Sequence, residues 1–185
     1  MLYEMKTPSN WQQVTLGQFM ELTAIPTDTD GFDLTNEHIA ILCEITQREV
    51  MQLDMATRDR IRETLAFIDT DPTGQFSATF WHSKKRWRVT DRITKLTAGQ
   101  YIDICSYLKH GASQNYHKIL AVICCPLRFG LFGHKYDADK SEQYADELLT
   151  LPVPVALAIA AFFLSSFEVY ATNIPTCLAE VKEKI

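Results

Sequence analysis

Histidine and cysteine are the side chains best suited to act as nucleophiles, proton carriers or metal ligands, and this chain has five of each. The histidines are His38, His82, His110, His117 and His134. His38 and His117 each begin an apolar stretch, the other three stand in unrelated sequence contexts, and no Cys-x-x-Cys pair occurs. The adjacent Cys124 and Cys125 have a poor spacing for metal ligands. We therefore expect no catalytic centre, no metal site and no cofactor.

Other reaction motifs are missing as well. The chain has no phosphate-binding glycine loop and no Gly-x-Ser-x-Gly elbow. The acidic segment Asp28–Asp33 lacks the later glutamate that completes a calcium-binding loop, so we interpret it as a solvated loop. Cys43, Cys105 and Cys124 lie on apolar helical faces, which is typical of small buried side chains in a reducing compartment.

The densest positive charge lies in one short segment between two tryptophans, Trp81 and Trp87. The candidate charged contacts in it are Lys84, Lys85, Arg86 and Arg88. Alternating polar and apolar residues around a turn near Ser83–Lys85 predict a β-hairpin. Basic residues beside aromatic rings can bind a nucleic acid strand. Because the net charge is −5, we favour edge protection against aggregation, or contact with an acidic protein partner, over nucleic acid.

An internal repeat organises the elements around this hairpin. The residues Thr15, Gly17 and Gln18 recur as Thr97, Gly99 and Gln100, at an offset of 97 − 15 = 82 residues. Threonine suits the N-cap of a helix, and glutamine three residues later completes a capping box. Glycine in the first helical turn has two interpretations, which are close packing of another backbone and a simple relic of the repeat.

The similarity continues downstream of this signature. The apolar helix around His38 matches the one around His117, and residues 53–68 match residues 151–167. We interpret the pattern as two copies of a three-helix unit packed together, with one β-hairpin between them, in a mainly α fold. Chance similarity between amphipathic helices is the alternative interpretation.

The predicted boundaries follow from this interpretation. The first helical repeat covers residues 1–74, the hairpin 75–92, the second repeat 93–172 and a C-terminal tail 173–185. The expected helices cover residues 15–24, 35–46, 56–67, 96–108, 114–125, 139–149 and 151–167. Residues 126–138 are expected to form an apolar loop. We expect the halves to pack into one compact domain.

Three apolar stretches are candidates for contact or burial. Residues 151–164 are uncharged but shorter than a membrane span, so we expect a buried helix and no membrane association. Apolar side chains in the loop and in the tail need cover from the core or from a partner. The candidate partner-binding residues are Phe129, Leu131, Phe132, Ile174, Leu178 and Val181.

Composition is that of a soluble globular protein. The chain has 185 residues, with 46% hydrophobic and 22% charged residues. This length can bury a sizeable core in one domain or in two fused halves. No N-terminal basic and then apolar segment predicts secretion.

The sequence resembles the tail assembly chaperones of tailed phages of gut bacteria. The segments that carry the resemblance are Trp11–Leu22, Leu96–Leu108, His117–Val122 and Leu151–Leu157. The resemblance implies a helical, non-enzymatic protein that holds the tape-measure protein during tail building. It implies the host cytoplasm during assembly, with the virion as a further location.

Three functions remain open at this point. The first is an assembly factor that shields apolar segments of a long helical partner, by a helix-in-groove mode. The second is a structural ring or connector subunit of the neck or tail, which would form a homo-oligomer. The third is a nucleic-acid-binding accessory protein that uses the basic hairpin.

Overall fold

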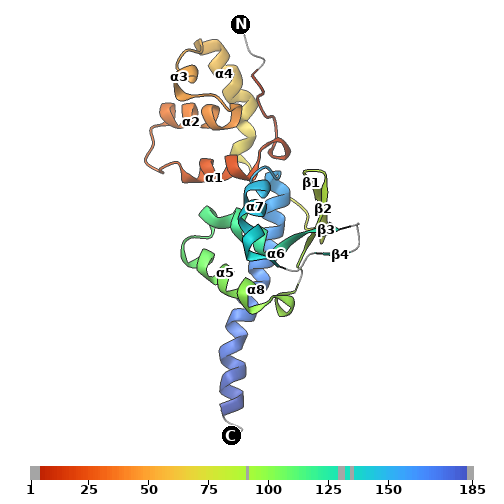
Figure 1. The fold of residues 1–185 in the computed structure, drawn as a ribbon. Helices are drawn as coiled ribbons and strands as arrows, with labels where there is room; N and C mark the ends of the chain where they lie inside the picture. The colour runs from red at the N-terminus through yellow and green to blue at the C-terminus, as the bar shows by residue number, and fades with distance from the viewer. Residues whose placement is uncertain (1–4, 91, 129–131, 134–135, 183–185) are drawn as a thin grey trace.

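The computed structural model describes residues 5–90, 92–128, 132–133 and 136–182, and the side chains of residues 5–90, 92–127 and 136–167. The chain is mainly helical with one small antiparallel sheet, which confirms the predicted class (Figure 1). Two groups of helices lie one above the other, and the N- and C-termini lie at opposite ends (Figure 1).

The first group contains short helices joined by brief turns. Its elements are η1 (Trp11–Gln13), α1 (Leu16–Ala24), α2 (Gly31–Cys43), α3 (Gln47–Val50), α4 (Met55–Thr64) and η2 (Leu65–Asp69). Ile39, Leu42 and Leu65 are central to its apolar core. Trp11 packs edge-on against both Phe19 of α1 and Phe67 of η2, so it joins these two elements.

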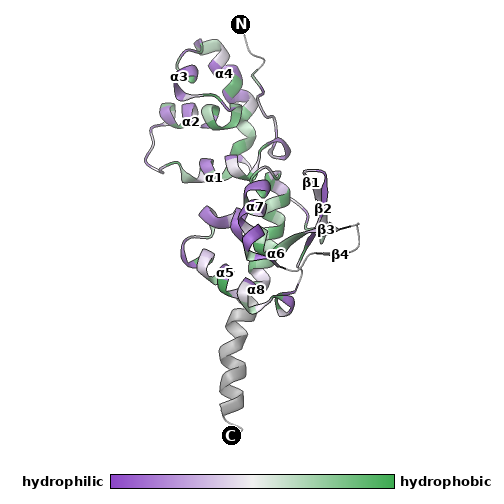
Figure 2. Cartoon of the chain, viewed as in Figure 1, coloured by the Kyte–Doolittle hydropathy of each residue, from purple (hydrophilic) through white to green (hydrophobic). Residues whose placement is uncertain are grey.

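The second group combines the sheet with longer helices. Its elements are β1 (Thr79–His82), β2 (Lys85–Val89), η3 (Ile93–Lys95), α5 (Ala98–Lys109), η4 (Ser113–Asn115), α6 (Tyr116–Ile123), β3 (Cys124–Arg128), β4 (Phe132–Gly133), α7 (Ala138–Leu148) and α8 (Val153–Lys182). The strands follow the order β1-β2-β3-β4, and each pair is antiparallel. α6 and the first part of α8 fill the centre, and Figure 2 shows this part of α8 as largely hydrophobic.

The two capping boxes form as predicted. Thr15 Oγ1 accepts the amide hydrogen of Gln18, and Gln18 Oε1 accepts that of Thr15. Thr97 and Gln100 repeat both bonds at the start of α5. The signature therefore marks two helix starts of the same construction.

Each capping glutamine also reaches the following helix. Gln18 Nε2 donates to the carbonyl of Ile41 in α2 at 3.3 Å, and Gln100 Nε2 donates to the carbonyl of Val122 in α6 at 2.7 Å. The shared contact joins the first two helices of each group. The correspondence with a third helix is not confirmed, because β3, β4 and α7 stand between α6 and α8.

Three segments differ from the predicted elements. α2 begins at Gly31 and not near Thr35 or Asn36, because the Asp30 carboxylate caps it by accepting the Phe32 amide at 2.8 Å. The expected solvated loop at residues 28–33 is therefore partly helical.

The predicted loop at residues 126–138 is also partly wrong. α6 ends at Ile123, and residues 124–128 form β3, which pairs with β2 so that Arg88 faces Cys125. The hairpin therefore belongs to a larger sheet. Non-local pairing with β2 supplies the hydrogen bonds that make this segment a strand.

The tail at residues 173–185 does not form a separate segment over its described part. α8 is one helix from Val153 to Lys182 and passes through Pro175, which removes one backbone hydrogen bond without ending the helix here. In Figure 1 the C-terminal half of α8 extends away from the rest of the molecule.

The junction between the groups is a short antiparallel contact. The Leu16 and Gly17 amides donate to the carbonyls of Leu151 and Leu149, each at 2.8 Å, and the Val153 amide donates to the carbonyl of Val14 at 3.0 Å. Leu149 lies close to Gly17, where an added Cβ would be 3.4 Å from the Leu149 oxygen. Of the two interpretations of the repeat glycines, close packing of another backbone therefore applies at Gly17.

Close packing of another backbone does not apply at Gly99. A Cβ added there would meet only the Thr97 hydroxyl, at 3.9 Å, so no other backbone requires glycine at this position.

The amide of Gln100 gives a first testable prediction. Gln100→Glu keeps the oxygen that caps Thr97 but removes the donor to Val122 and buries a carboxylate beside a carbonyl. We expect this change to lower the free energy of unfolding by about 2 kcal/mol, measured by urea denaturation. Gln18→Glu is the matched control and should cost less, because Gln18 is less buried and water screens the repulsion that the new carboxylate meets at the exposed Glu44. Equal losses in the two variants would contradict the prediction.

A second prediction concerns Gly74, in the extended segment that crosses α8. An added Cβ would lie 2.0 Å from the Pro154 carbonyl oxygen, and the neighbouring Phe76 stacks on Phe162 of α8. We expect Gly74→Ala to destabilise the fold by roughly 1–3 kcal/mol, measured by thermal unfolding. Gly31→Ala is the control, because nothing lies within 4 Å of its added Cβ. It should leave stability unchanged or raise it slightly. If Gly74→Ala left the stability unchanged, the contact between Gly74 and Pro154 would not be tight.

Candidate functional site

The β1–β2 hairpin has two different faces. A two-residue turn at Ser83 and Lys84, both with positive φ, closes it, and this geometry matches the twist of paired strands. The register places Trp81 opposite Arg86 and Thr79 opposite Arg88. These four residues share one side of the sheet, which we call the outer sheet face.

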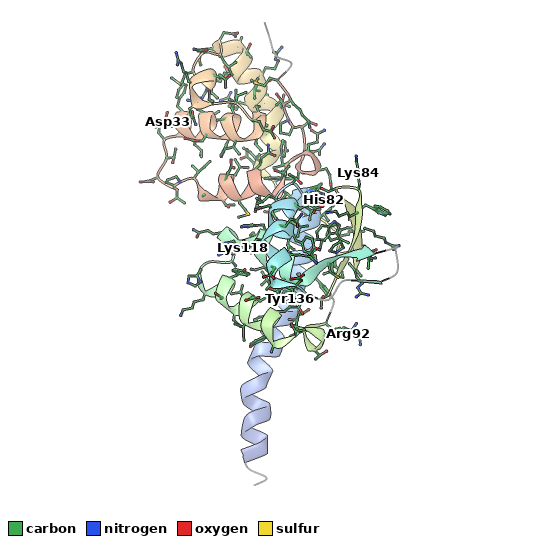
Figure 3. All side chains as sticks on the ribbon, viewed as in Figure 1. Asp33, His82, Lys84, Arg92, Lys118 and Tyr136 are labelled. Carbon is green, nitrogen blue, oxygen red and sulfur yellow. The ribbon has the colours of Figure 1, made fainter. Side chains whose placement is uncertain are left out.

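The inner side of the hairpin is fixed to α7. Trp87 is fully buried and packs edge-on against Tyr144 at 5.4 Å, so it is a core residue and not a ligand-binding aromatic. His82 Nε2 is 2.9 Å from the Glu147 carbonyl oxygen. Figure 3 shows His82 directed toward the body and Lys84 away from it. The hairpin is therefore held rigidly while its tip and outer face remain exposed.

The predicted charged contacts do not act as one group. Lys85 Nζ forms a salt bridge with Glu147 at 2.7 Å, so Lys85 helps to hold the hairpin against α7. Arg86 lies within 3.4 Å of the Thr79 hydroxyl, and Arg88 lies beside Cys125. Within the described side chains, neither arginine has a carboxylate at salt-bridge distance. Arg86 and Arg88 therefore make the outer sheet face cationic, with Trp81 beside them at 74% exposure.

The apolar residues predicted to bind a partner lie outside the described side chains. Phe129 and Leu131 are not described at all, and Phe132 is described only as backbone in β4. Ile174, Leu178 and Val181 are described only as backbone positions of α8. Their roles stay predictions.

A groove lies between α2 and α4, continuing along η2. It has a volume of about 410 Å³. Its apolar lining is Leu34, Ile39, Leu65, Ala66 and Ile68, and its polar lining is Thr35, His38, Arg62, Glu63 and Asp69. We call this the α2–α4 groove. It combines an apolar floor with charged groups of both signs.

His38 and His117 do not meet. His117 lines a separate hollow of about 260 Å³ with Tyr107 of α5 and Ser141 of α7. Burial lowers the pKa of His38, opposed by the Asp69 carboxylate. Burial also lowers the pKa of His117, and the Lys118 ammonium adds to this effect. The matched histidines therefore favour their neutral form in two separate places.

A third hollow, of about 680 Å³, lies beside the sheet and the start of α5. Arg88, Gln100 and Tyr136 contribute to its lining. The Tyr136 hydroxyl donates to the Asp103 carboxylate, and burial together with this bond raises the pKa of Tyr136 to about 12. Tyr136 therefore remains protonated near neutral pH and acts as a hydrogen-bond donor.

Sequence reasoning missed an exposed apolar cluster in the first group. Phe32, Met51 and Met55 are 46%, 66% and 59% exposed, and we call them the Phe-Met patch. They surround a buried polar pair, in which Arg58 Nε donates to Asn36 Oδ1 at 2.9 Å. The Arg58 guanidinium lies 4.1 Å from the centre of the Phe32 ring.

Arg58 and Asn36 also lie next to the two methionines of the patch. Met51 Sδ accepts from Asn36 Nδ2 at 3.7 Å, and Met55 precedes Arg58 by about one turn. The signal that could have found this patch is the N-cap at Asp30, which puts Phe32 into the first turn of α2.

The described residues hold no group of three or more histidine, cysteine, aspartate or glutamate side chains that could bind a metal ion. Cys43 and Cys124 are buried free thiols, and Cys105 is partly buried. Over the described part of the chain, no helix is both long and apolar enough to cross a membrane.

No family model, curated protein or solved structure matches the chain.

The two lowered histidine pKa values predict a pH dependence of stability. Each folded-state pKa lies below the unfolded value of about 6.5, so the unfolded chain binds more protons in this range. The stabilisation that comes from keeping the two histidines neutral is present above about pH 6.5. It is lost as the pH falls toward their folded-state pKa values. We expect the free energy of unfolding, measured in urea, to fall from about pH 7.5 to about pH 5.5.

The double variant His38→Gln and His117→Gln should show a flatter profile over the same range. The lowered carboxylate pKa values, such as that of Asp54, act at lower pH and do not interfere. A profile that is equally steep in the variant would assign the effect to other groups.

Proposed function

We propose that the chain is a non-enzymatic assembly protein, similar to a tail assembly chaperone, that binds an apolar helical segment of a long tape-measure-type partner. The α2–α4 groove supports this proposal most directly. An amphipathic helix buries an apolar face in such a groove, while charged residues on the rim pair with its polar flanks. Ile39 and Leu65 form a buried floor, and Arg62 and Glu63 offer charge of both signs.

The surroundings of the groove favour a preformed binding site. The N-cap bond of Asp30 and the capping box of Thr46 and Glu49 fix the helix ends nearby. The buried bond between Arg58 and Asn36 ties α4 to α2. A groove held open in this way does not require the protein to reorganise on binding, which lowers the cost of association.

A structural ring or connector subunit of the neck or tail is the second candidate. The observation that favours it is the exposed Trp81 beside Arg86 and Arg88 on a rigid sheet, which suits a contact between subunits. Nucleic acid binding by the same residues is disfavoured, because the chain carries a net charge of −5. In both favoured proposals the protein acts in the host cytoplasm during virion assembly.

Site-specific crosslinking tests the groove. A photoreactive amino acid at Ala66, which lines the groove and is itself exposed, should crosslink to an apolar helical segment of a co-produced tape-measure-type protein, with the crosslinked peptide identified by mass spectrometry. The same probe at the exposed Ala24 of α1 is the matched control and should give no such product.

Filling the groove gives the complementary test. Ala66→Trp adds a large side chain in the hollow, and it should reduce partner recovery at least tenfold while Ala24→Trp does not. Equal recovery with both variants would exclude the groove as the binding site.

A further inference from the structure

Charge is distributed very unevenly along the chain. Residues 75–96 contain six lysine and arginine residues and one acidic residue, a formal charge of +5. The whole chain carries −5, so the remaining residues carry −10. Residues 28–55 contain seven acidic residues and one arginine, a formal charge of −6. The segment with the outer sheet face is therefore cationic and the segment with the Phe-Met patch is anionic, while Arg58, the cation that packs on Phe32, is buried.

Each of these surfaces contains exposed apolar side chains. The outer sheet face has Trp81 between its cations, and the Phe-Met patch lies within the acidic stretch. Aromatic anchors bordered by complementary charge are the usual centre of a protein interface. Methionines adapt their shape to a large aromatic ring, so the Phe-Met patch suits a tryptophan.

The two surfaces belong to different parts of the molecule, the Phe-Met patch to the first group of elements and the outer sheet face to the second. Figure 3 shows Asp33 on one side of the molecule and Lys84 on the opposite side. One copy therefore cannot bring its own two surfaces together. A contact between different surfaces of two copies is heterologous and continues from copy to copy, either to a closed ring or to an open chain.

We propose that the outer sheet face of one copy binds the Phe-Met patch of a second copy, with Trp81 against Met51 and Met55. In this contact Arg86 and Arg88 lie against Asp28 and Asp33, which are within four residues of Phe32 in the chain. Complementarity in both charge and apolar surface selects a second copy as the occupant. A nucleic acid would engage Arg86 and Arg88 but would leave the Phe-Met patch unused.

This inference does not rest on the α2–α4 groove. The outer sheet face is in the second group of elements, and the Phe-Met patch does not contribute to the lining of the groove. The groove-filling variant Ala66→Trp should self-associate like the original chain, so the two proposals can fail separately.

Sedimentation velocity of the full chain tests the contact. We expect the average mass to rise with concentration at low salt and to fall toward the monomer in about 1 M sodium chloride, where charges are screened beyond about 3 Å. Arg86→Glu with Arg88→Glu should weaken self-association at least tenfold. Asp28→Lys with Asp33→Lys should do the same, and neither aspartate is an N-cap residue.

Mixing the two variants gives the decisive result. Each charge variant keeps one intact surface, and the two altered surfaces again carry opposite charges, so the mixture should recover the self-association that each variant alone has lost. Met51→Lys, at an exposed position, is a second variant of the acidic surface, and circular dichroism confirms that each variant is folded.

Three results would overturn the inference. They are a chain that is monomeric at all concentrations, self-association that is unchanged in both charge variants, and binding of a single-stranded DNA oligonucleotide through Arg86 and Arg88 without any self-association.

Discussion

The hydrogen bonds between residues 14–17 and residues 149–153 hold the two groups of elements together. The first amides of any helix lack partners within the helix, and at α1 they are paired by carbonyls from beyond the end of α7. Side chains on the two sides of this contact diverge into different cores. Val14 and Val153 enter the core of the first group, whereas Leu16 and Leu151 enter that of the second. Losing the contact would therefore open both cores.

This junction explains why the surfaces of the molecule have fixed positions. The start of α8 contributes Val153 and Leu157 to the first core and Ala156 and Ile159 to the second, so one helix supports both groups. The α2–α4 groove and the Phe-Met patch belong to the first group, and the outer sheet face belongs to the second. A partner that contacts both groups meets one defined arrangement, which suits a protein whose proposed role is assembly.

Local interactions made part of the fold predictable. Thr15 and Gln18 form their capping box within four residues, as do Thr97 and Gln100, so the pattern alone predicts both helix starts. The turn at residues 83–84 is equally local. Asn36 shows the limit of this reasoning. It looks like an N-cap residue, but its side chain bonds Arg58 in another helix, and Asp30 caps α2 instead.

The sequence by itself determined the mainly helical class, the two capped helix starts and the basic hairpin, because these depend on contacts between residues a few positions apart. Only the tertiary structure decided that residues 124–128 join the hairpin as a strand and that Trp87 is buried while Trp81 is exposed. It also decided that Phe32, Met51 and Met55 gather in one patch. These features depend on which distant segments pack together, since burial and strand pairing are set by neighbours that lie far away along the chain.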